Sequence, residues 1–233
     1  MFQHLFDPKV ILVTWPVLLF SLSLHEFLHA WMADRLGDPT ARYKGRLMIN
    51  PIAHYDPIGT TMGLLFGIGW AKPVPVNAAV FRWPKRDMML TALGGPAANF
   101  ALAVCFAVVF KLLFHVWPVA ERGGLGATGP TVELVEKMAA YGVLLNLSLA
   151  IFNLIPLYPL DGHHILRGFL SFHAALAYDK VKYFGSYILV FLIVASSSGL
   201  VSIISRPVFF LIDLAFTDAE YYQLYAVVSP LLR

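Results

Sequence analysis

Long apolar stretches separated by short polar segments dominate the pattern of this chain. Four of them, Val10–Ala33, Met88–Val116, Val132–Ile155 and Tyr183–Ile204, are long enough to cross a bilayer as helices of about 20 residues. The pattern therefore predicts four spanning helices. Pro207–Phe216 is also apolar but too short to span, so we expect it to lie at the membrane interface or to pack on the helical bundle.

The segment after the first predicted span has a different pattern. Ile58–Trp70 is apolar, but it has 13 residues, contains four glycines and is flanked by prolines, which disfavours a spanning helix. Non-helical backbone at membrane depth must be buried in protein or line a wet cavity. We therefore interpret Leu47–Val80 as a re-entrant β-hairpin or small sheet.

The predicted fold class is a mainly α-helical polytopic membrane protein with about four spanning helices and this re-entrant β element. Residues 1–216 are expected to form the membrane-embedded core, and residues 217–233 a short interfacial tail. Composition agrees, because the chain is 58% hydrophobic and 13% charged, whereas a soluble domain carries roughly 25% charged residues. The apolar run from Val10 is interpreted as a retained helix, because it has no small-residue cleavage site.

Charge and cysteine content narrow the function further. Cys105 is the only cysteine, which excludes an intrachain disulfide and zinc sites built from several cysteines. We find no arginine cluster interleaved with aromatics, so we expect no nucleic-acid partner. The expected surroundings are the lipid bilayer of the cell membrane, and the sequence specifies no oligomeric state.

Basic residues in short loops mark the cytoplasmic face of a membrane protein. In the four-span arrangement the larger set of them falls on the face that holds the C-terminal end of the first helix, so this face should be cytoplasmic. That set is Arg35, Arg42, Lys44, Arg46, Lys72, Arg82, Lys85, Arg86, Arg167, Lys180 and Lys182. His25 precedes Asp34 by nine residues, which places it about 13 Å into the membrane from that end.

The sequence HEFLH, residues 25–29, lies inside the first predicted span. Residues four apart share one helix face, so His25 and His29 can present both imidazoles to one metal ion. The glutamate of such a motif is the usual general base of a zinc hydrolase, which indicates Glu26. HExxH arises by coincidence in soluble helices, but charged and polar residues are costly at membrane depth and are rarely there without a function.

A catalytic zinc needs a third protein ligand. The third predicted span ends in NLIPLYPLDG, residues 153–162, where Pro156 and Pro159 should end or unwind the helix. Asp161 then sits on non-helical backbone that can bend back inward, and it is the candidate ligand that completes a His₂Asp site. The alternative is an ordinary turn aspartate before Gly162.

These residues give the chain its resemblance to a known family. It resembles the site-2 protease family of intramembrane zinc metalloproteases over roughly residues 20–170. The resemblance rests on five ordered segments: HEFLH, the run from Asn50 to Thr60, GIGWAKPVPVN from Gly67 to Asn77, GGPAAN from Gly94 to Asn99, and NLIPLYPLDG from Asn153 to Gly162. No PDZ or CBS domain is evident, so the chain resembles a minimal core.

The resemblance implies one Zn²⁺ per chain, held by His25, His29 and Asp161, with Glu26 as catalytic base. The implied reaction is peptide-bond hydrolysis in or near a transmembrane helix of a membrane-protein or peptide substrate. Two other interpretations remain. A metal transporter could use the same residues as a permeation site, although Val10–Leu24 offers few polar residues. A pseudo-protease that only binds membrane proteins would not need an intact HExxH.

Weaker candidates surround this site. His54 could approach the metal or a developing oxyanion, or it could only tie down a loop. Asn153 could stabilise an oxyanion, or it could hydrogen-bond between helices as is expected of Asn99 and Asn146. The segment Gly67–Asn77, or a partner strand near Leu47–Ile49, could clamp an unwound substrate beside the zinc by strand addition. The residues proposed for this clamp are Gly67, Gly69, Val74 and Val76.

Overall fold

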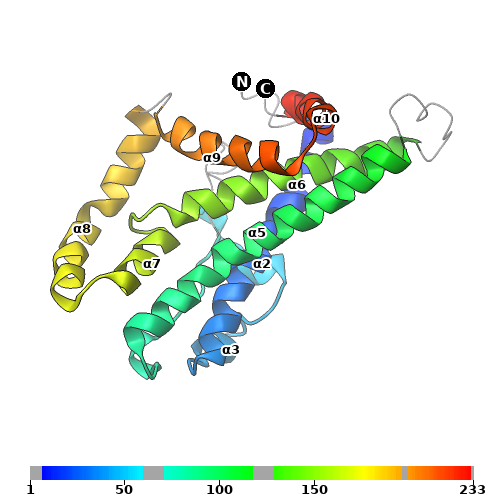
Figure 1. Cartoon of the computed structure of the whole chain (residues 1–233). Coiled ribbons are helices and arrows are strands. Elements are labelled where there is room, and N and C mark those ends of the chain that lie inside the picture. Colours follow the sequence, from blue (N-terminus) through cyan, green and yellow to red (C-terminus); the bar gives the residue numbers. More distant parts are fainter. Residues whose placement is uncertain (1–6, 60–70, 118–128, 196–198, 232–233) are drawn as a thin grey trace.

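The computed structural model describes residues 7–59, 71–117, 129–195 and 199–231 (Figure 1). It is mainly helical, and no described residue belongs to a β-strand. The elements follow in the order α2 (Pro8–Arg35), α3 (Thr40–Tyr43), η1 (Pro51–His54), η2 (Ala78–Val80), α5 (Pro84–Val116), α6 (Gly129–Leu154), α7 (Asp161–Phe169), α8 (Phe172–Ala195), α9 (Gly199–Ala215), α10 (Asp218–Val228) and η4 (Ser229–Leu231).

Three helices are long and apolar enough to cross a membrane: α2, α5 and α6, with mean hydropathies of 1.7, 2.2 and 1.4 over their most apolar windows. They contain the first three predicted spans, apart from the final residue of the third. Each helix satisfies its own backbone hydrogen bonds, which lipid requires. Three candidate spans indicate that the chain is a multi-pass membrane protein.

The fourth predicted span, Tyr183–Ile204, differs from what the structure shows. Its residues are divided between α8 and α9, with 196–198 outside the described part. Helix α8 begins eleven residues earlier than predicted, at Phe172, and its first half carries Asp179, Lys180 and Lys182. Neither helix is among the candidate spans found in the described ranges.

The predicted β element, Leu47–Val80, also differs in its described residues. It contains two 3₁₀ turns and an irregular stretch at 71–77. The side chains of Asn50 and Asn77 cap these turns by accepting hydrogen bonds from Ile52 N at 3.0 Å and Ala79 N at 3.1 Å. Asparagine caps of this kind compete with strand ladders. Residues 60–70 lie outside the described part.

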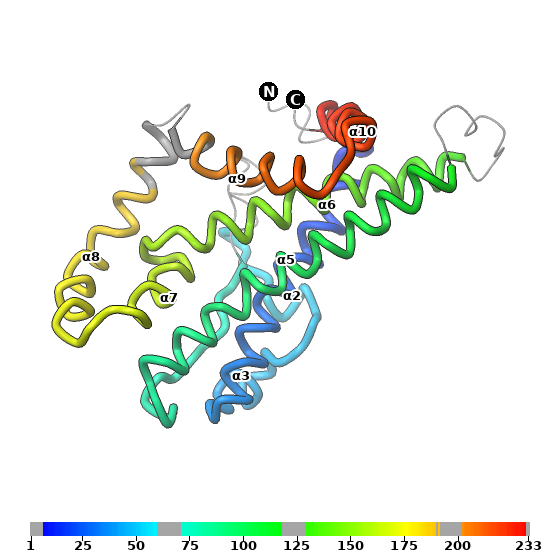
Figure 2. Tube along the Cα trace, viewed as in Figure 1, coloured from blue at the N-terminus to red at the C-terminus, as the bar shows by residue number. Residues whose placement is uncertain are grey.

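Helix α5 is the centre of the molecule. It runs antiparallel beside α6 and crosses α2 (Figure 2), and these two contacts are the most extensive between described elements. The apolar core lies mainly between α5, α6, α9 and α10; its buried members are Ala103, Phe110, Ala139, Ala140, Val143, Leu147, Val208, Ile212, Phe216, Leu224 and Val228. Pro207–Phe216, which comprises the second half of α9 and the residue after it, therefore packs on the bundle. Helix α10 belongs to the predicted tail, and the division into core and tail stays a prediction.

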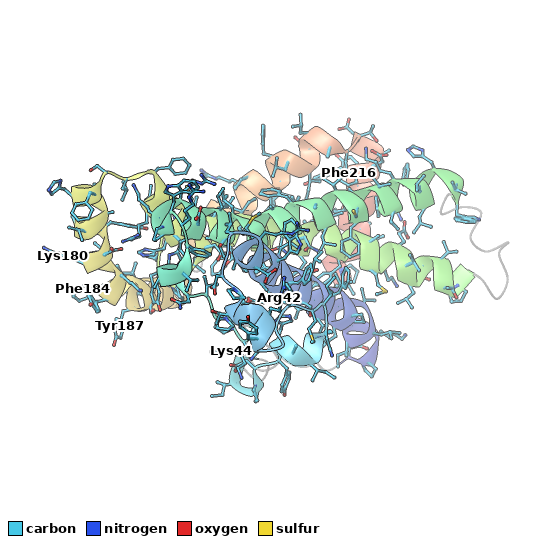
Figure 3. All side chains as sticks on the ribbon, turned by 90° about the horizontal axis from the view of Figure 1, so that it is seen from below. Arg42, Lys44, Lys180, Phe184, Tyr187 and Phe216 are labelled. Carbon is cyan, nitrogen blue, oxygen red and sulfur yellow. The ribbon has the colours of Figure 1, made fainter. Side chains whose placement is uncertain are left out.

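Helix α8 stands apart from α2, α5 and α6, and the chain reaches it through α7 and leaves it through α9 (Figure 1). Its outer side carries large exposed side chains. Figure 3 shows Phe184 and Tyr187 pointing away from the other helices, and they are 65% and 76% exposed. Such a surface suits contact with lipid rather than water.

Candidate metal centre

Two imidazoles and one carboxylate meet at the middle of the molecule. His25 and His29, one turn apart on α2, place their Nε2 atoms 3.0 Å from each other. The Oδ2 of Asp161 lies 3.3 Å from His25 Nε2, and its Oδ1 lies 3.3 Å from His29 Nε2. Within the described ranges this is the one group of histidine, cysteine and acidic side chains that could hold a metal ion. The structure thus brings the three predicted ligands together.

The chain returns to α2 immediately after α6. Helix α6 ends at Leu154, and residues 155–160 form tight turns before α7 begins at Asp161. Gly162 packs against the end of α6, because a Cβ at this position would lie 2.3 Å from the backbone oxygen of Ile155. Glycine therefore permits the close approach that turns Asp161 back toward the two histidines.

Helix α5 makes room for both imidazoles at Gly95. A Cβ at this position would lie 2.4 Å from His25 Cε1 and 2.4 Å from His29 Nε2. Any side chain here would have to displace one ring or the other. Gly94, the preceding residue, also lies close to α2, because a Cβ there would be 2.8 Å from the backbone oxygen of Leu28.

The hydrogen bonds of the two imidazoles fix which nitrogen carries the proton. His25 Nδ1 lies 2.6 Å from Asn99 Oδ1, and His29 Nδ1 lies 2.8 Å from the backbone oxygen of Thr91. Both oxygens are acceptors, so each neutral ring is protonated at Nδ1 and has a lone pair at Nε2.

In the neutral rings these two lone pairs face each other across 3.0 Å. Asp161 Oδ2 is buried beside them and has no hydrogen-bond partner. Two imidazole nitrogens and one carboxylate, all offering electron pairs to the same small space, repel one another unless a cation lies between them. The donor set fits zinc, which takes nitrogen and oxygen ligands and keeps an open position when catalytic.

Glu26 lies next to this cluster on α2. Its Oε2 accepts a hydrogen bond of 2.9 Å from the backbone N–H of Val74, which belongs to the irregular stretch at 71–77. The candidate base and the candidate clamp, 48 residues apart in sequence, are therefore in direct contact. Sequence reasoning had placed the two only in the same neighbourhood.

The other predicted site residues take different positions. His54 is buried, its Nε2 lies 2.9 Å from Met48 O, and its own backbone oxygen accepts from Lys72 N. It thus ties two loops together and is not among the grouped ligands. Half-buried Asn153 donates to Leu149 O in its own helix. Val76 is half-buried. Gly67 and Gly69 lie outside the described residues.

Asp38 is a positioning residue that sequence reasoning missed. It is fully buried, and its carboxylate accepts from Asn77 N at 2.6 Å and from Thr40 N at 3.0 Å. It thereby joins the stretch that contacts Glu26 to the turn after α2. The signal was present in the sequence as Asp-Pro-Thr, a turn pattern in which the aspartate commonly binds backbone N–H groups ahead of it.

A second set of contacts fixes α7, which begins with Asp161. The Arg167 guanidinium binds Asp179 of α8 with both Nε and Nη2, at 2.8–3.0 Å, and holds the pKa of that carboxyl below its usual range. The ring of His163 stacks on the ring of Tyr178, with 4.8 Å between the ring centroids. Helix α8 therefore supports the element that carries Asp161, the candidate carboxylate ligand.

Comparison with known proteins gives a consistent result. Residues 14–196 match peptidase family M50. The chain is 40% identical over 151 residues to "Putative zinc metalloprotease YwhC" of Bacillus subtilis, covering 64% of this chain and 65% of that protein.

Two mycobacterial proteins, both named "Putative zinc metalloprotease Rip2", are also similar. The one from Mycolicibacterium smegmatis is 29% identical over 185 residues, covering 76% of this chain and 64% of that protein. The one from Mycobacterium tuberculosis is 31% identical over 183 residues, covering 76% of this chain and 63% of that protein. The chain thus spans just under two thirds of the length of these curated relatives. No solved structure matches it.

Proposed function

The chain belongs to peptidase family M50, and from this premise we propose that it is a zinc metalloprotease that hydrolyses peptide bonds in or near transmembrane helices of membrane proteins. The observation that carries the proposal is the meeting of two Nε2 lone pairs and an unpartnered Asp161 oxygen beside Glu26. The test is loss of cleavage with retention of zinc in a Glu26→Gln protein.

In this proposal His25, His29 and Asp161 hold one zinc ion per chain. Zinc supplies Lewis acidity, which polarises the scissile carbonyl and lowers the pKa of water. The remaining steps belong to the protein. Val74 N–H holds Glu26 through Oε2, so Oε1 takes the proton from the attacking water. As the water oxygen bonds to the carbonyl carbon and the C–N bond breaks, Glu26 passes this proton to the leaving nitrogen.

The membrane setting follows from α2, α5 and α6, each of which can span a bilayer. We propose that the end of α2 at Arg35, together with the start of α5 at Pro84, faces the cytoplasm. The exposed basic residues Arg42 and Lys44 on and just after α3, labelled in Figure 3, support this orientation. The proposed core extends over residues 1–216.

Cysteine labelling tests the orientation. In a Cys105→Ser background, a cysteine at Arg42 should react only after the membrane is permeabilised, because we place it inside. A cysteine at Gly126 should react with an impermeant reagent in intact cells. Labelling of position 42 but not of position 126 in intact cells would reverse the orientation.

We further propose that the stretch at 71–77 receives the unwound substrate beside Glu26. A peptide bond in a helix is already hydrogen-bonded, so cleavage in a membrane requires local unwinding and new backbone partners. Pro73 and Pro75 lack N–H groups, and the Val74 N–H points at Glu26. A substrate strand that adds here would therefore pair with carbonyl oxygens of the stretch and not with its N–H groups at positions 73–75. Substrates weakened by glycine, asparagine or proline near the cut should be preferred.

The contact between Val74 and Glu26 gives a direct test of this arrangement. Val74→Pro removes the N–H donor, so the carboxylate of Glu26 loses its orientation, and we expect kcat to fall at least about tenfold. Val74→Ala keeps the donor and should stay near the wild-type kcat. Both variants should bind zinc normally. Equal kcat values for the proline and alanine variants would contradict the proposed role of the N–H group.

A further inference from the structure

We propose that Asn99, Asn146 and Ser21 form a hydrogen-bonded chain that sets the tautomer of His25 and presents its Nε2 to the metal. These positioning residues come from α5, α6 and α2. The inference rests on the proposed zinc site. In it, side chains from all three candidate spans together orient one ligand, His25.

The chain of hydrogen bonds is continuous and buried. Asn99 Oδ1 lies 2.6 Å from His25 Nδ1, and Asn99 Nδ2 donates to Asn146 Oδ1 at 2.9 Å. Asn146 Nδ2 donates to Ser21 Oγ at 2.9 Å and also to the backbone oxygen of Gly142 at 2.9 Å. Asn99, Asn146 and Ser21 are each 0% exposed, so water cannot replace any of these bonds.

The Gly142 carbonyl determines which atom donates and which accepts in each of these hydrogen bonds. A carbonyl only accepts, so the Asn146 atom beside it must be the NH₂ group, and the other end of that amide must be the oxygen. That oxygen requires a donor from Asn99, which turns the Asn99 oxygen toward His25. An oxygen there requires the Nδ1 of His25 to carry the proton. The direction thus follows from a backbone group and not from an arbitrary choice between amide rotamers.

Helix α5 serves both histidines from one face. Positions 91, 95 and 99 recur every fourth residue, so they lie along one side of the helix. Thr91 offers its backbone oxygen to His29, Gly95 leaves space for both rings, and Asn99 offers its side chain to His25. His29 is therefore oriented by backbone, whereas the orientation of His25 depends on side chains that a substitution can remove.

A merely structural role of these residues would give different results when they are substituted. If the amides only held helices together, every substitution that breaks the chain would lower stability and leave the metal affinity of the folded protein unchanged. If they orient His25, the acceptor at position 99 should decide the affinity. Asn99→Asp keeps an acceptor for the Nδ1 proton, whereas Asn99→Leu has none. Loss of a partner of this kind typically weakens metal binding 10–100-fold.

Competition with a zinc chelator on the full-length protein in detergent provides the first measurement. We expect zinc binding to weaken roughly 10–100-fold in Asn99→Leu and to return to within a few-fold of wild type in Asn99→Asp. Ser23→Ala is the matched control, because Ser23 is also buried on α2 but its hydroxyl donates to Leu19 O of its own helix. It should not change the affinity. Wild-type affinity in folded Asn99→Leu would overturn the proposal.

Nitrogen NMR of ¹⁵N-histidine-labelled full-length protein provides the second measurement and needs no amide substitution. The signal of His25 is assigned by its loss in His25→Gln. We expect Nδ1–H in wild type, with or without zinc, and a neutral His25 ring protonated at Nε2 instead of Nδ1 in the metal-free protein would overturn the inference. If wild type binds no zinc, the proposed function fails, while the tautomer still decides whether the chain of amides orients His25.

Discussion

Replacing His25 with alanine should remove zinc from this protein. The purified wild type should carry about one zinc ion per chain, because three protein ligands are sufficient for a catalytic zinc site. His25→Ala leaves His29 and Asp161, two ligands that cannot enclose the ion. We expect less than about a tenth of the wild-type zinc content after dialysis, measured by elemental analysis against protein concentration.

A second histidine makes this result specific. His115 lies at the C-terminal end of α5, and its Nε2 is 3.1 Å from Glu220 Oε1. In sequence it is far from α2. Its side chain is 67% exposed. His115→Ala should keep the full zinc content. Stoichiometric zinc in His25→Ala, or equal losses in both variants, would show that the metal is held elsewhere.

Replacing Glu26 with glutamine should abolish proteolysis and leave the zinc in place. Glutamine has the size of glutamate and can still accept the hydrogen bond from Val74 N, but it cannot take a proton from water. General base catalysis contributes about 10²–10⁴-fold to rates, so turnover should fall by at least that range. A metal transporter would not need this proton acceptor, so near-normal transport with no proteolysis in either protein would favour that alternative.

The sequence predicted the centre of this structure because the relevant patterns are local. The HEFLH spacing requires only helical geometry for His25 and His29 to share a face, and three apolar stretches were long enough to identify α2, α5 and α6. The return of Asp161 was predictable because Pro156 and Pro159 cannot continue a helix. These inferences needed no knowledge of tertiary contacts.

The predictions that differ from the described residues depend on distant contacts or on competing local preferences. Leu47–Val80 was expected to form strands, but asparagine caps at positions 50 and 77 favour 3₁₀ turns in the described residues. The fourth span was placed by hydropathy alone, whereas α8 begins at Phe172, and its polar first half binds α7 through Asp179 and Arg167. Hydropathy does not indicate that these charges have partners.

The hydrogen-bond partners of the candidate site residues could not be predicted from the sequence either. Asn99 was expected to bond between helices, and it does so through Asn146, but its bond to His25 required the relative rotation of α2 and α5. The same holds for the contact between Glu26 and Val74, which joins segments 48 residues apart. Asp38 was missed because its Asp-Pro-Thr pattern indicates a turn, but not that the same carboxylate also binds Asn77 N, 39 residues along the chain.

Hydrolysis of a peptide bond within a membrane segment can be measured directly on this site. The most direct test reconstitutes the purified full-length protein in vesicles with a transmembrane substrate and determines product masses in ¹⁸O-labelled water. We expect two products, cut in or near the spanning segment, with ¹⁸O in the new carboxyl group, and no products from zinc-loaded Glu26→Gln protein. Equal amounts of the same products from wild type and Glu26→Gln would contradict this expectation.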